Sequence, residues 1–416
     1  MNSVYDFLLI LLQCAISKST LPDTDYEADW NKVYNEACAH GIEAIIYSTV
    51  EKLPEGQKPP PELLAMWKKN ALSSAFKQMN MISNLFSVLE MANNDGFTPI
   101  IVKGPILGEL YCEPLTRYSG DIDILIDKKD ESNLLSIFRN YGCIQETVPS
   151  DNKHEHTYSL NTGIQYEVHR RLWEEKINSP RYKALEDADI TSVDSLIRLN
   201  VMGRQILTLG HREHFTFMIY HMVKHFVVNG MGIRLLSDMT LYYNAYKNEI
   251  SLQKLWEDIE NLGYKNFCES VFSLCIKLFH MDSSIFPDYL NHNEVSEKMI
   301  LKDIWEGGLF GKRTAARELS GRFLRQYYEN EDKKLPKNRF MLFLAFLVPT
   351  SSELERIDFM PLSANKLIAW FQRTKYLLSR WLYRKTRGLR NCSMKERMDC
   401  SMKRISMLEQ VDLLKQ

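Results

Sequence analysis

Two aspartates, Asp121 and Asp123, lie two residues apart in an otherwise apolar run that ends at Ile126. Successive side chains of a β-strand point to opposite faces, so we expect both carboxylates on one face and Ile122 and Ile124 in the core. Two carboxylates this close raise each other's pKa unless a cation lies between them. Because Mg2+ prefers carboxylate oxygens, the spacing favours a metal site on a rigid strand. The alternative is that this face of the strand is solvated and the aspartates keep it soluble.

The segment before the aspartates predicts a strand, a turn and a short helix. An apolar run, residues 100–102, leads into Lys103 and Gly104, and Pro105 then suits the first position of a helix. Pro114 stops any continuation of that helix. Helix N-termini bind phosphate, and this one is expected at the same end of the strand as the acids. A metal site beside a phosphate site describes a nucleotide-binding site.

This motif resembles the acidic motif of the polymerase-beta-type nucleotidyltransferase superfamily, and it contains Lys103, Gly104, Arg117, Gly120, Asp121 and Asp123. More narrowly, the chain resembles a bacterial family of uncharacterised nucleotidyltransferases over roughly residues 29–311. The resemblance includes Glu167 and the helix around His221 and His225. Where the wider superfamily usually has a Gly-Ser or Gly-Gly turn, this chain has Lys103-Gly104.

The resemblance implies that the protein transfers a nucleoside monophosphate from an NTP to an acceptor and releases pyrophosphate, with the help of two Mg2+ ions. It assigns Asp121 and Asp123 to both metals. It assigns Glu167, on a later strand of the same sheet, to the catalytic ion and to deprotonation of the acceptor hydroxyl. Glu167 is otherwise a solvent-facing strand acid.

Four residues are expected to contact the nucleotide: Lys103, Gly104, Arg117 and Gly120. Gly104 would let the backbone approach the triphosphate closely, and the guanidinium of Arg117 has the fork geometry for phosphate. Both cations also have structural interpretations. Arg117 could form an ion pair with Asp127 or Glu113, and Lys103 could solvate a strand end.

Five further residues are candidates for the substrate pocket: His169, His221, His225, Arg234 and Asp238. His169 lies two residues after Glu167, on the same strand face, and could contact substrate or hydrogen-bond a carboxylate. His221 and His225 are one helical turn apart on one face and could ligate a metal or shape the acceptor pocket. They lack the H-E-x-x-H pattern of zinc proteases, and structural packing is the other interpretation.

Composition bounds the classes of function. The chain has 416 residues, 45% hydrophobic and 25% charged, which is ordinary for a globular protein of two or three domains. A net charge of −1 gives no general attraction to nucleic acid. The 8 cysteines show no C-x-x-C pair or zinc spacing, which is typical of reduced thiols. We find no signal-peptide pattern and no apolar run long enough to span a membrane, so we predict a cytoplasmic protein.

The predicted fold class is α+β, with a small mixed β-sheet of nucleotidyltransferase type flanked and wrapped by α-helices. We expect strands at 154–160 and 164–168, and a mixture of helix and loop at 170–205. A long helix is expected at 61–94, with a buried stripe formed by Leu72, Phe76, Met79, Ile82, Phe86 and Leu89. The predicted division is an N-terminal helical segment (1–96), a catalytic core (97–205), a C-terminal helical domain (206–369) and a basic amphipathic tail (370–416).

These sequence features identify the expected substrates and binding partners only in part. The expected substrates are an NTP and an unidentified acceptor, either a small molecule, a sugar or a protein. A second hypothesis is a non-catalytic nucleotide-binding or scaffolding protein that retains the fold. A third is an RNA-modifying transferase that uses the tail, in which aromatic residues alternate with arginine and lysine. The tail could equally form a solvated amphipathic helix or contact a membrane surface.

Overall fold

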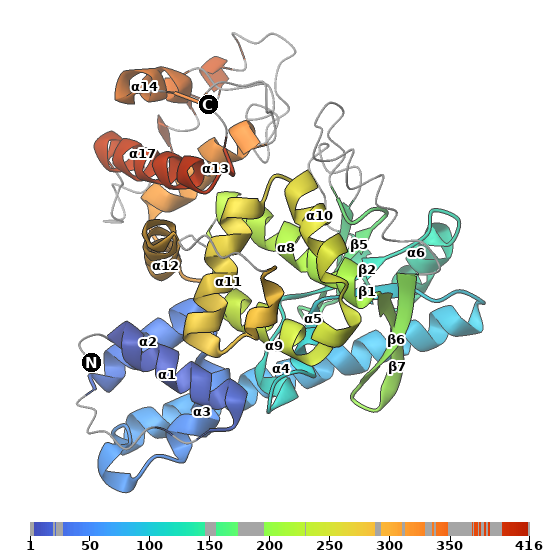
Figure 1. Ribbon diagram of the computed structural model, residues 1–416. Coiled ribbons are helices and arrows are strands. Elements are labelled where there is room, and N and C mark those ends of the chain that lie inside the picture. The colour runs from blue at the N-terminus through green and yellow to red at the C-terminus, as the bar shows by residue number, and fades with distance from the viewer. Residues whose placement is uncertain are drawn as a thin grey trace.

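The computed structural model describes residues 4–19, 21, 28–145, 155–173, 195–228, 230–287, 293–309, 313–328, 335–336, 338–347 and 393–414, with some residues between 368 and 382. Within these ranges the chain combines many helices with two small sheets, so the predicted α+β class is confirmed. Figure 1 shows most of the helices to the left of the larger sheet, with α4 running below it and α6 at its right. None of the described helices has the length and apolar character needed to cross a membrane.

The chain begins with four helices, which are α1 (Val4–Ser17), α2 (Trp30–His40), α3 (Glu43–Glu51) and α4 (Pro61–Asn94), with the 3-10 turn η1 (Glu55–Gln57) between the last two. Asp29 caps the start of α2 by accepting the amide hydrogen of Lys32, and Gly41 ends it with φ +63°. Pro61 opens α4 at the first helical position. The first three helices pack on one another and on α4, which then runs past the sheet (Figure 1).

The larger sheet has five strands in the order β1-β2-β5-β4-β3. These are β1 (Ile100–Val102), β2 (Asp121–Leu125), β3 (Ile144–Gln145), β4 (Glu155–Ser159) and β5 (Gln165–His169). Only β2 and β5 pair in parallel, and the other three pairs are antiparallel. The strands at 154–160 and 164–168 are confirmed as β4 and β5, and Gly163, with φ +84°, lies in their turn.

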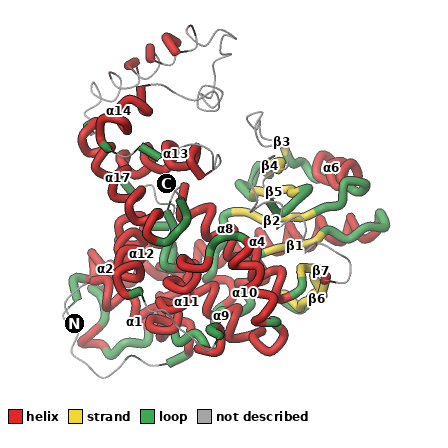
Figure 2. The backbone as a smooth tube through the Cα atoms, turned by 45° about the horizontal axis from the view of Figure 1, so that its top comes forward, coloured by secondary structure: helices red, strands yellow, loops and turns green. Residues whose placement is uncertain are grey.

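Three short elements complete the sheet region: the helix α5 (Gly104–Gly108), the 3-10 turn η2 (Pro114–Thr116) and the helix α6 (Glu131–Asn140). The first two connect β1 to β2 along the chain. The short helix predicted to begin at Pro105 is confirmed as α5, and it ends before Pro114. Helix α6 lies between β2 and β3, and it buries Leu134 and Phe138 completely. Figure 2 shows the sheet standing beside the main helical part, with α6 at its outer end.

A second sheet, the hairpin of β6 (Leu196–Val201) and β7 (Arg204–Leu209), was missed in the sequence. Met202 and Gly203 form its turn, both with positive φ, as a two-residue hairpin requires. The expectation of helix and loop at 170–205 is therefore wrong for 196–205, and 174–194 lies outside the described residues. Strand β7 lies against β1, so the expected boundary at residue 205 falls inside an element that contacts the core. The division into four parts otherwise stays a prediction.

The C-terminal part is helical, as expected, in the residues that the structure describes. Its helices are α8 (His211–Val228), α9 (Arg234–Tyr246), α10 (Leu252–Asn261), α11 (Lys265–Phe279), α12 (Glu294–Gly307), α13 (Ala315–Tyr328), α14 (Arg339–Leu347) and α17 (Met394–Gln410), with the 3-10 turns η4 (Lys247–Glu249) and η5 (Ser283–Ile285). Helix α13 packs on α8, and α11 contacts both α9 and α1. The C-terminal helices thus contact the N-terminal helices through α11 and α1.

The basic tail is only partly described, and most of 370–392 lies outside the described residues. Its final helix, α17, packs on α13 and α12 and buries Leu408. Arg404 of α17 is buried and donates a hydrogen bond to the carbonyl oxygen of Phe226 in α8. This end of the tail is therefore docked on the protein, while contact of the rest with RNA or a membrane stays a prediction.

The apolar stripe expected along α4 is only half correct. Ile82 and Leu89 are buried, but Leu72 is 61% exposed and Phe76 is 65% exposed. Met79 is also exposed. The residues that α4 buries instead begin with Trp67, whose indole N–H donates to the carbonyl oxygen of Glu43 at 2.8 Å. The helix turns a different face to the core than its most apolar residues suggested.

Replacing Leu85 by Ala should lower the free energy of unfolding by about 2–5 kcal/mol, because Leu85 of α4 is fully buried and its removal leaves a cavity. The matched control is Leu72→Ala on the same helix, which should change stability by about 0.5 kcal/mol or less. Urea unfolding followed by far-UV circular dichroism measures both. Equal losses for the two variants would show that the Leu72 face is covered.

Candidate active site

The parallel pairing of β2 with β5 brings the predicted acids together. Its register places Asp123 directly opposite Glu167. Because strand side chains alternate, Asp121 and His169 share the face of these two acids. The isoleucines of β2 point to the opposite face and are fully buried, which fixes which side of the strand the aspartates occupy.

Asp123 is a buried carboxylate with a contact at each oxygen. Its Oδ2 lies 3.0 Å from Nζ of Lys103, and its Oδ1 lies 3.1 Å from Nε2 of His169. The same imidazole nitrogen is 3.8 Å from Oε2 of Glu167. Burial by itself would raise the pKa of Asp123, but the charge of Lys103 and the contact with His169 outweigh it and hold that pKa well below its usual range.

Asp121 behaves in the opposite way, although it is only two residues away. Burial first, and then the negative charge of Asp123, raise the pKa of its carboxyl group, while Lys103, His169 and Arg117 only partly offset this. The two aspartates therefore form an unequal pair, in which Asp123 carries the charge and Asp121 is the group on which a proton is held more easily.

The backbone at Lys103 is held in an unusual conformation. This residue has φ +54°, a region that side chains other than glycine rarely adopt, and Gly104 follows with φ +23°. The amide hydrogen of Lys103 is donated to Nε2 of His214 at 3.0 Å. Burial, together with the nearby charges of His211 and Lys103, lowers the pKa of His214 to about 3, so its imidazole is neutral and can accept that hydrogen.

Arg117, expected at the phosphates, is paired with Asp238 of α9. Its Nε lies 2.9 Å from Oδ1 and its Nη2 lies 2.7 Å from Oδ2, a bidentate geometry. Both side chains are buried. Burial opposes the charge of Arg117, but Asp238 outweighs it and raises the pKa of the guanidinium. Neither Asp127 nor Glu113, the acids considered from the sequence, is its partner.

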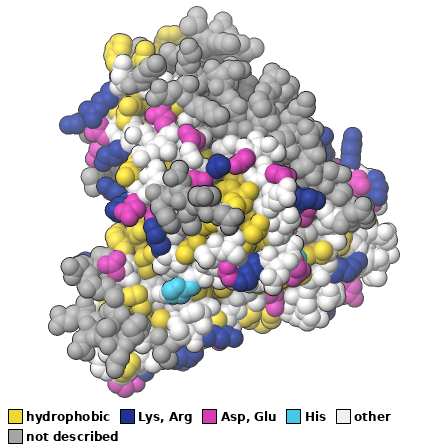
Figure 3. Space-filling view, viewed as in Figure 1, with side chains coloured by type: hydrophobic (Ala, Val, Ile, Leu, Met, Phe, Trp, Pro, Cys, Tyr) yellow, Lys and Arg dark blue, Asp and Glu magenta, His cyan; other side chains and the backbone are white. Residues whose placement is uncertain are grey.

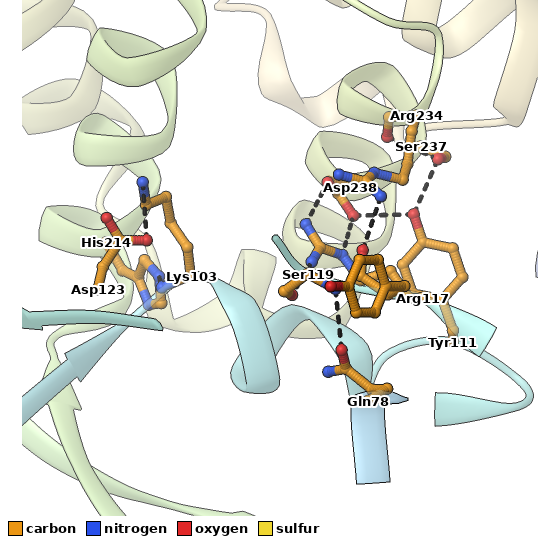
Figure 4. A network of polar contacts seen from close by, with 11 residues as sticks. Gln78, Lys103, Tyr111, Arg117, Ser119, Asp123, His214, Arg234, Ser237 and Asp238 are labelled. Atoms are coloured by element: carbon orange, nitrogen blue, oxygen red, sulfur yellow. Dashed lines mark hydrogen bonds and ion pairs between the residues drawn. The ribbon is translucent and has the colours of Figure 1, made fainter. Parts of the chain in front are cut away.

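A small polar network surrounds this pair (Figure 4). Tyr111 donates its hydroxyl hydrogen to Oδ1 of Asp238 at 2.8 Å, and Nη1 of Arg117 donates to Ser119 at 2.8 Å. The amide hydrogen of Ser119 is donated to the buried side chain of Gln78, on α4. The network therefore ties the loop before β2 to α4 on one side and to α9 on the other.

Arg234 has a different environment from Arg117. It donates a hydrogen bond from Nη1 to the carbonyl oxygen of Tyr118 at 2.8 Å. Burial, and then the charge of Arg117, lower the pKa of Arg234. Among the described residues it forms no ion pair, and its Nε has no hydrogen-bond partner.

One cavity of about 90 Å³ lies between the sheet and helices α8 and α9. Its polar wall contains Lys103, Gly104, Arg117, Ser119, Gly120, Asp121, Asp123, His221, Arg234 and Asp238, and its apolar wall contains Leu107, Met218, Met222, Leu235 and Met239. Sites for organic ligands usually measure several hundred Å³. The cavity therefore has room for only part of a nucleotide in this conformation.

Two of the predicted pocket histidines, His221 and His225, contact each other, with 2.9 Å between their Nε2 atoms. Burial, and then the charge of Lys103, lower the pKa of His221 well below its usual value, so this ring is neutral. Of the two, only His221 lines the cavity. The structure thus brings His221, Arg234 and Asp238 to the cavity wall, and it brings His169 to the acids.

The sequence model of a family described as uncharacterised nucleotidyltransferase matches residues 26–280. The chain belongs to this family. No curated protein and no solved structure gives a match. The matched region contains all the strands and the helices α2 to α11, so the nucleotidyltransferase family match includes every residue of the cavity.

The donor atoms of the acids fit a metal ion. Asp123, Glu167 and His169 each offer an atom, and these three atoms lie within 4.8 Å of one another. Two carboxylates and one imidazole are a common ligand set for divalent metals, and the carboxylates suit Mg2+ or Mn2+. Asp121 is outside this group of three, although it lines the same cavity.

Sequence reasoning missed several residues that hold this site, above all His214, Tyr111 and Gln78. A signal existed for His214, because it lies seven residues before His221 and therefore on the same face of α8. For the other two no local signal existed. A glutamine in the middle of a long helix is ordinarily exposed, and only the folded chain shows that Gln78 is buried against Ser119.

His214 should make the protein less stable in mild acid. Its pKa is about 3 in the folded state and about 6.5 when unfolded, so only the unfolded chain takes up a proton between these values. The stabilisation is complete above pH 6.5 and is lost as the pH falls, by about 2 kcal/mol at pH 5. His214→Gln, which keeps an acceptor for Lys103, should lose about 2 kcal/mol less than wild type between pH 7.5 and 5.

Urea unfolding at both pH values measures this difference. His156→Gln, on the partly exposed strand β4, is the matched control; it keeps His214 and should therefore retain the loss that His214 causes. A His214→Gln variant that follows the wild-type pH dependence would contradict the assignment of a buried neutral imidazole.

Proposed function

We propose that this protein is a metal-dependent nucleotidyltransferase that moves a nucleoside monophosphate from an NTP to an acceptor hydroxyl and releases pyrophosphate. The observation that carries the proposal is the β2–β5 register, which sets Glu167 opposite Asp123 with Asp121 and His169 on the same face. The cavity above this face, with cations on its wall, supports a phosphate-bearing substrate. Membership of the nucleotidyltransferase family supports the type of reaction.

The proposed mechanism uses the acids first as ligands. Asp121, Asp123 and Glu167 would hold Mg2+ or a similar ion, and two ions are expected. The bound metal supplies positive charge to the phosphate oxygens in the transition state. The side chain of Glu167 is 29% exposed while that of Asp123 is 3% exposed, so we assign to Glu167 the role of accepting the proton of the acceptor hydroxyl. The acceptor oxygen then bonds to the α-phosphorus, and the bond to the β-phosphate breaks.

The proposed triphosphate contacts come from the cavity wall. Arg234 is half-buried, forms no ion pair among the described residues, and has a buried Nε without a hydrogen-bond partner, so an anionic group would stabilise its charge. Arg117 is already neutralised by Asp238, so we assign it to positioning the loop of Ser119 and Gly120. Gly104 presents a backbone without a side chain beside that loop.

The acceptor is unidentified, and we favour a small molecule, a sugar or a protein side chain over a nucleic acid. The apolar wall of methionines and leucines can contact many organic groups, because methionine adapts to irregular shapes. On the face that Figure 3 shows, the described basic and acidic side chains are interspersed and form no broad positive area. Nucleic-acid binding by charge requires such an area.

One observation favours the alternative of a nucleotide-binding protein without turnover. Lys103 is in contact with Asp123, where a metal would bind. If that lysine remained there permanently, it would replace the ion and the protein could bind a nucleotide without transferring it. Label transfer from an NTP separates these functions.

Glu167→Gln should reduce transfer about 100-fold or more, because it removes charge that holds the metal and accepts the proton. The measurement uses each of the four NTPs labelled at the α-phosphate, with Mg2+ and with extracts of metabolites or proteins as acceptor pools. Transferred label and released pyrophosphate are both quantified.

Asp127→Asn is the matched control, since this exposed carboxylate lies two residues beyond the end of β2 and contacts only its neighbour Lys129 among the described residues. It should keep the wild-type rate. Full activity in Glu167→Gln would refute the catalytic assignment. Nucleotide binding without transfer in the wild type, with every NTP and acceptor pool, would support the binding protein.

Arg234→Met should weaken binding of a non-hydrolysable NTP analogue about tenfold or more, because a hydrogen bond to a charged phosphate contributes about 1.5–3 kcal/mol. Binding of the corresponding nucleoside should not change, since it has no phosphate. Isothermal titration calorimetry measures both ligands. Arg204→Met, an exposed arginine on β7, is the control and should bind as wild type does. An equal loss for nucleoside and triphosphate would exclude a phosphate contact at Arg234.

A further inference from the structure

Asp123 and Lys103 are each other's buried partners. The side chain of Asp123 is 3% exposed and that of Lys103 is 11% exposed, with 3.0 Å between Oδ2 and Nζ. The other oxygen of Asp123 contacts His169. A buried charge is stable only when an opposite charge or hydrogen bonds compensate it. Neither of the two residues can therefore leave the other unless another ion of the right sign takes its place.

The structure keeps Lys103 at this position through its backbone and its side chain. The positive φ of Lys103 costs energy for any residue with a side chain, and His214 fixes this conformation by accepting the amide hydrogen. The ammonium group also lies over the ring of Phe217, 5.2 Å from its centre. The left side of Figure 4 shows Lys103 with Asp123 and His214. Strain at a residue with a buried charge is typical of a functional position.

Lys103 shares its cavity with the proposed phosphate contacts. Gly104, Gly120 and Arg234 line the same small space, and the flexible four-carbon stem of lysine can carry its ammonium group from a carboxylate to a phosphate there. This inference rests on the proposed function, and it concerns which charged ligands can bind without the other. A metal ion alone would compensate Asp123 but separate Lys103 from its ion-pair partner, and a triphosphate alone would compensate Lys103 but take from Asp123 the cation that pairs with it.

We propose that Lys103 is the resting counter-ion of Asp123 and exchanges that carboxylate for the triphosphate when the metal-bound nucleotide enters. Asp123 would then be held by the metal, so both of these buried charges keep a partner. Metal and nucleotide consequently bind together, and each raises the affinity for the other. Lys103 is thus a positioning residue for metal binding as well as a phosphate contact. Without nucleotide, it lowers the affinity of the acids for metal ions.

The test measures Mn2+ affinity without nucleotide, from the electron paramagnetic resonance signal of the free ion. Lys103→Met, which keeps an unbranched chain and removes the charge, should bind Mn2+ about tenfold more tightly than wild type, because the competing cation is gone. Glu167→Gln should bind Mn2+ more weakly than both. This readout needs no turnover, so it does not depend on knowledge of the acceptor.

The second measurement is the affinity for a fluorescent, non-hydrolysable NTP with and without Mn2+. In wild type, Mn2+ should raise this affinity by a factor in the range of about 5 to 150, as is usual for coupled sites. In Lys103→Met the factor should be clearly smaller. By thermodynamic linkage the same factor describes the effect of the nucleotide on Mn2+ binding.

The outcomes separate the inference from the proposed function. If Lys103→Met binds Mn2+ as wild type does or more weakly, while Glu167→Gln loses binding, the inference is overturned and the metal site stands. If neither wild type nor Lys103→Met binds Mn2+, with or without nucleotide, the proposed function fails as well. Should Lys103→Met not fold, Lys103→Gly replaces it, because glycine adopts positive φ without strain and also lacks the charge.

Discussion

The parallel pairing of β2 with β5 is the constraint on which the candidate site depends. A shift of one residue in this register would move Glu167 away from Asp123 and turn it toward the core face. The buried isoleucines of β2 prevent such a shift, because it would expose them. Burial of ordinary apolar side chains on one side of β2 thus determines that Asp121, Asp123 and Glu167 lie on the opposite face of the sheet.

The second requirement is that the helical part meets the sheet at a fixed position. The buried ion pair of Arg117 and Asp238 satisfies this requirement, because the pair joins the loop before β2 to α9 across a sequence separation of 121 residues. A buried ion pair adds little stability compared with apolar packing, but it demands one geometry. The cavity wall formed by α8 and α9 is therefore held at one distance from the acids.

Local patterns in the sequence predicted the parts of the structure that depend on local physics. The acid strand follows from alternation, α4 begins at Pro61, and the β4–β5 turn follows from Gly163. The partners of Arg117 and Lys103 could not be predicted, because they come from distant segments whose approach depends on the whole fold. The β6–β7 hairpin was missed because its Met-Gly turn is not among the strong hairpin signals, and Phe76 was placed in the core because periodicity cannot tell which face of a helix is covered.

Helix α4 has 34 residues and a length of about 50 Å, and it carries Gln78 near its middle. Through that side chain it holds the amide of Ser119, so one continuous rod links the N-terminal helices to the loop that precedes the acids. A displacement of α4 would therefore move the side chain that holds this loop. Because α4 supports this loop, the N-terminal region is part of the framework that positions the site.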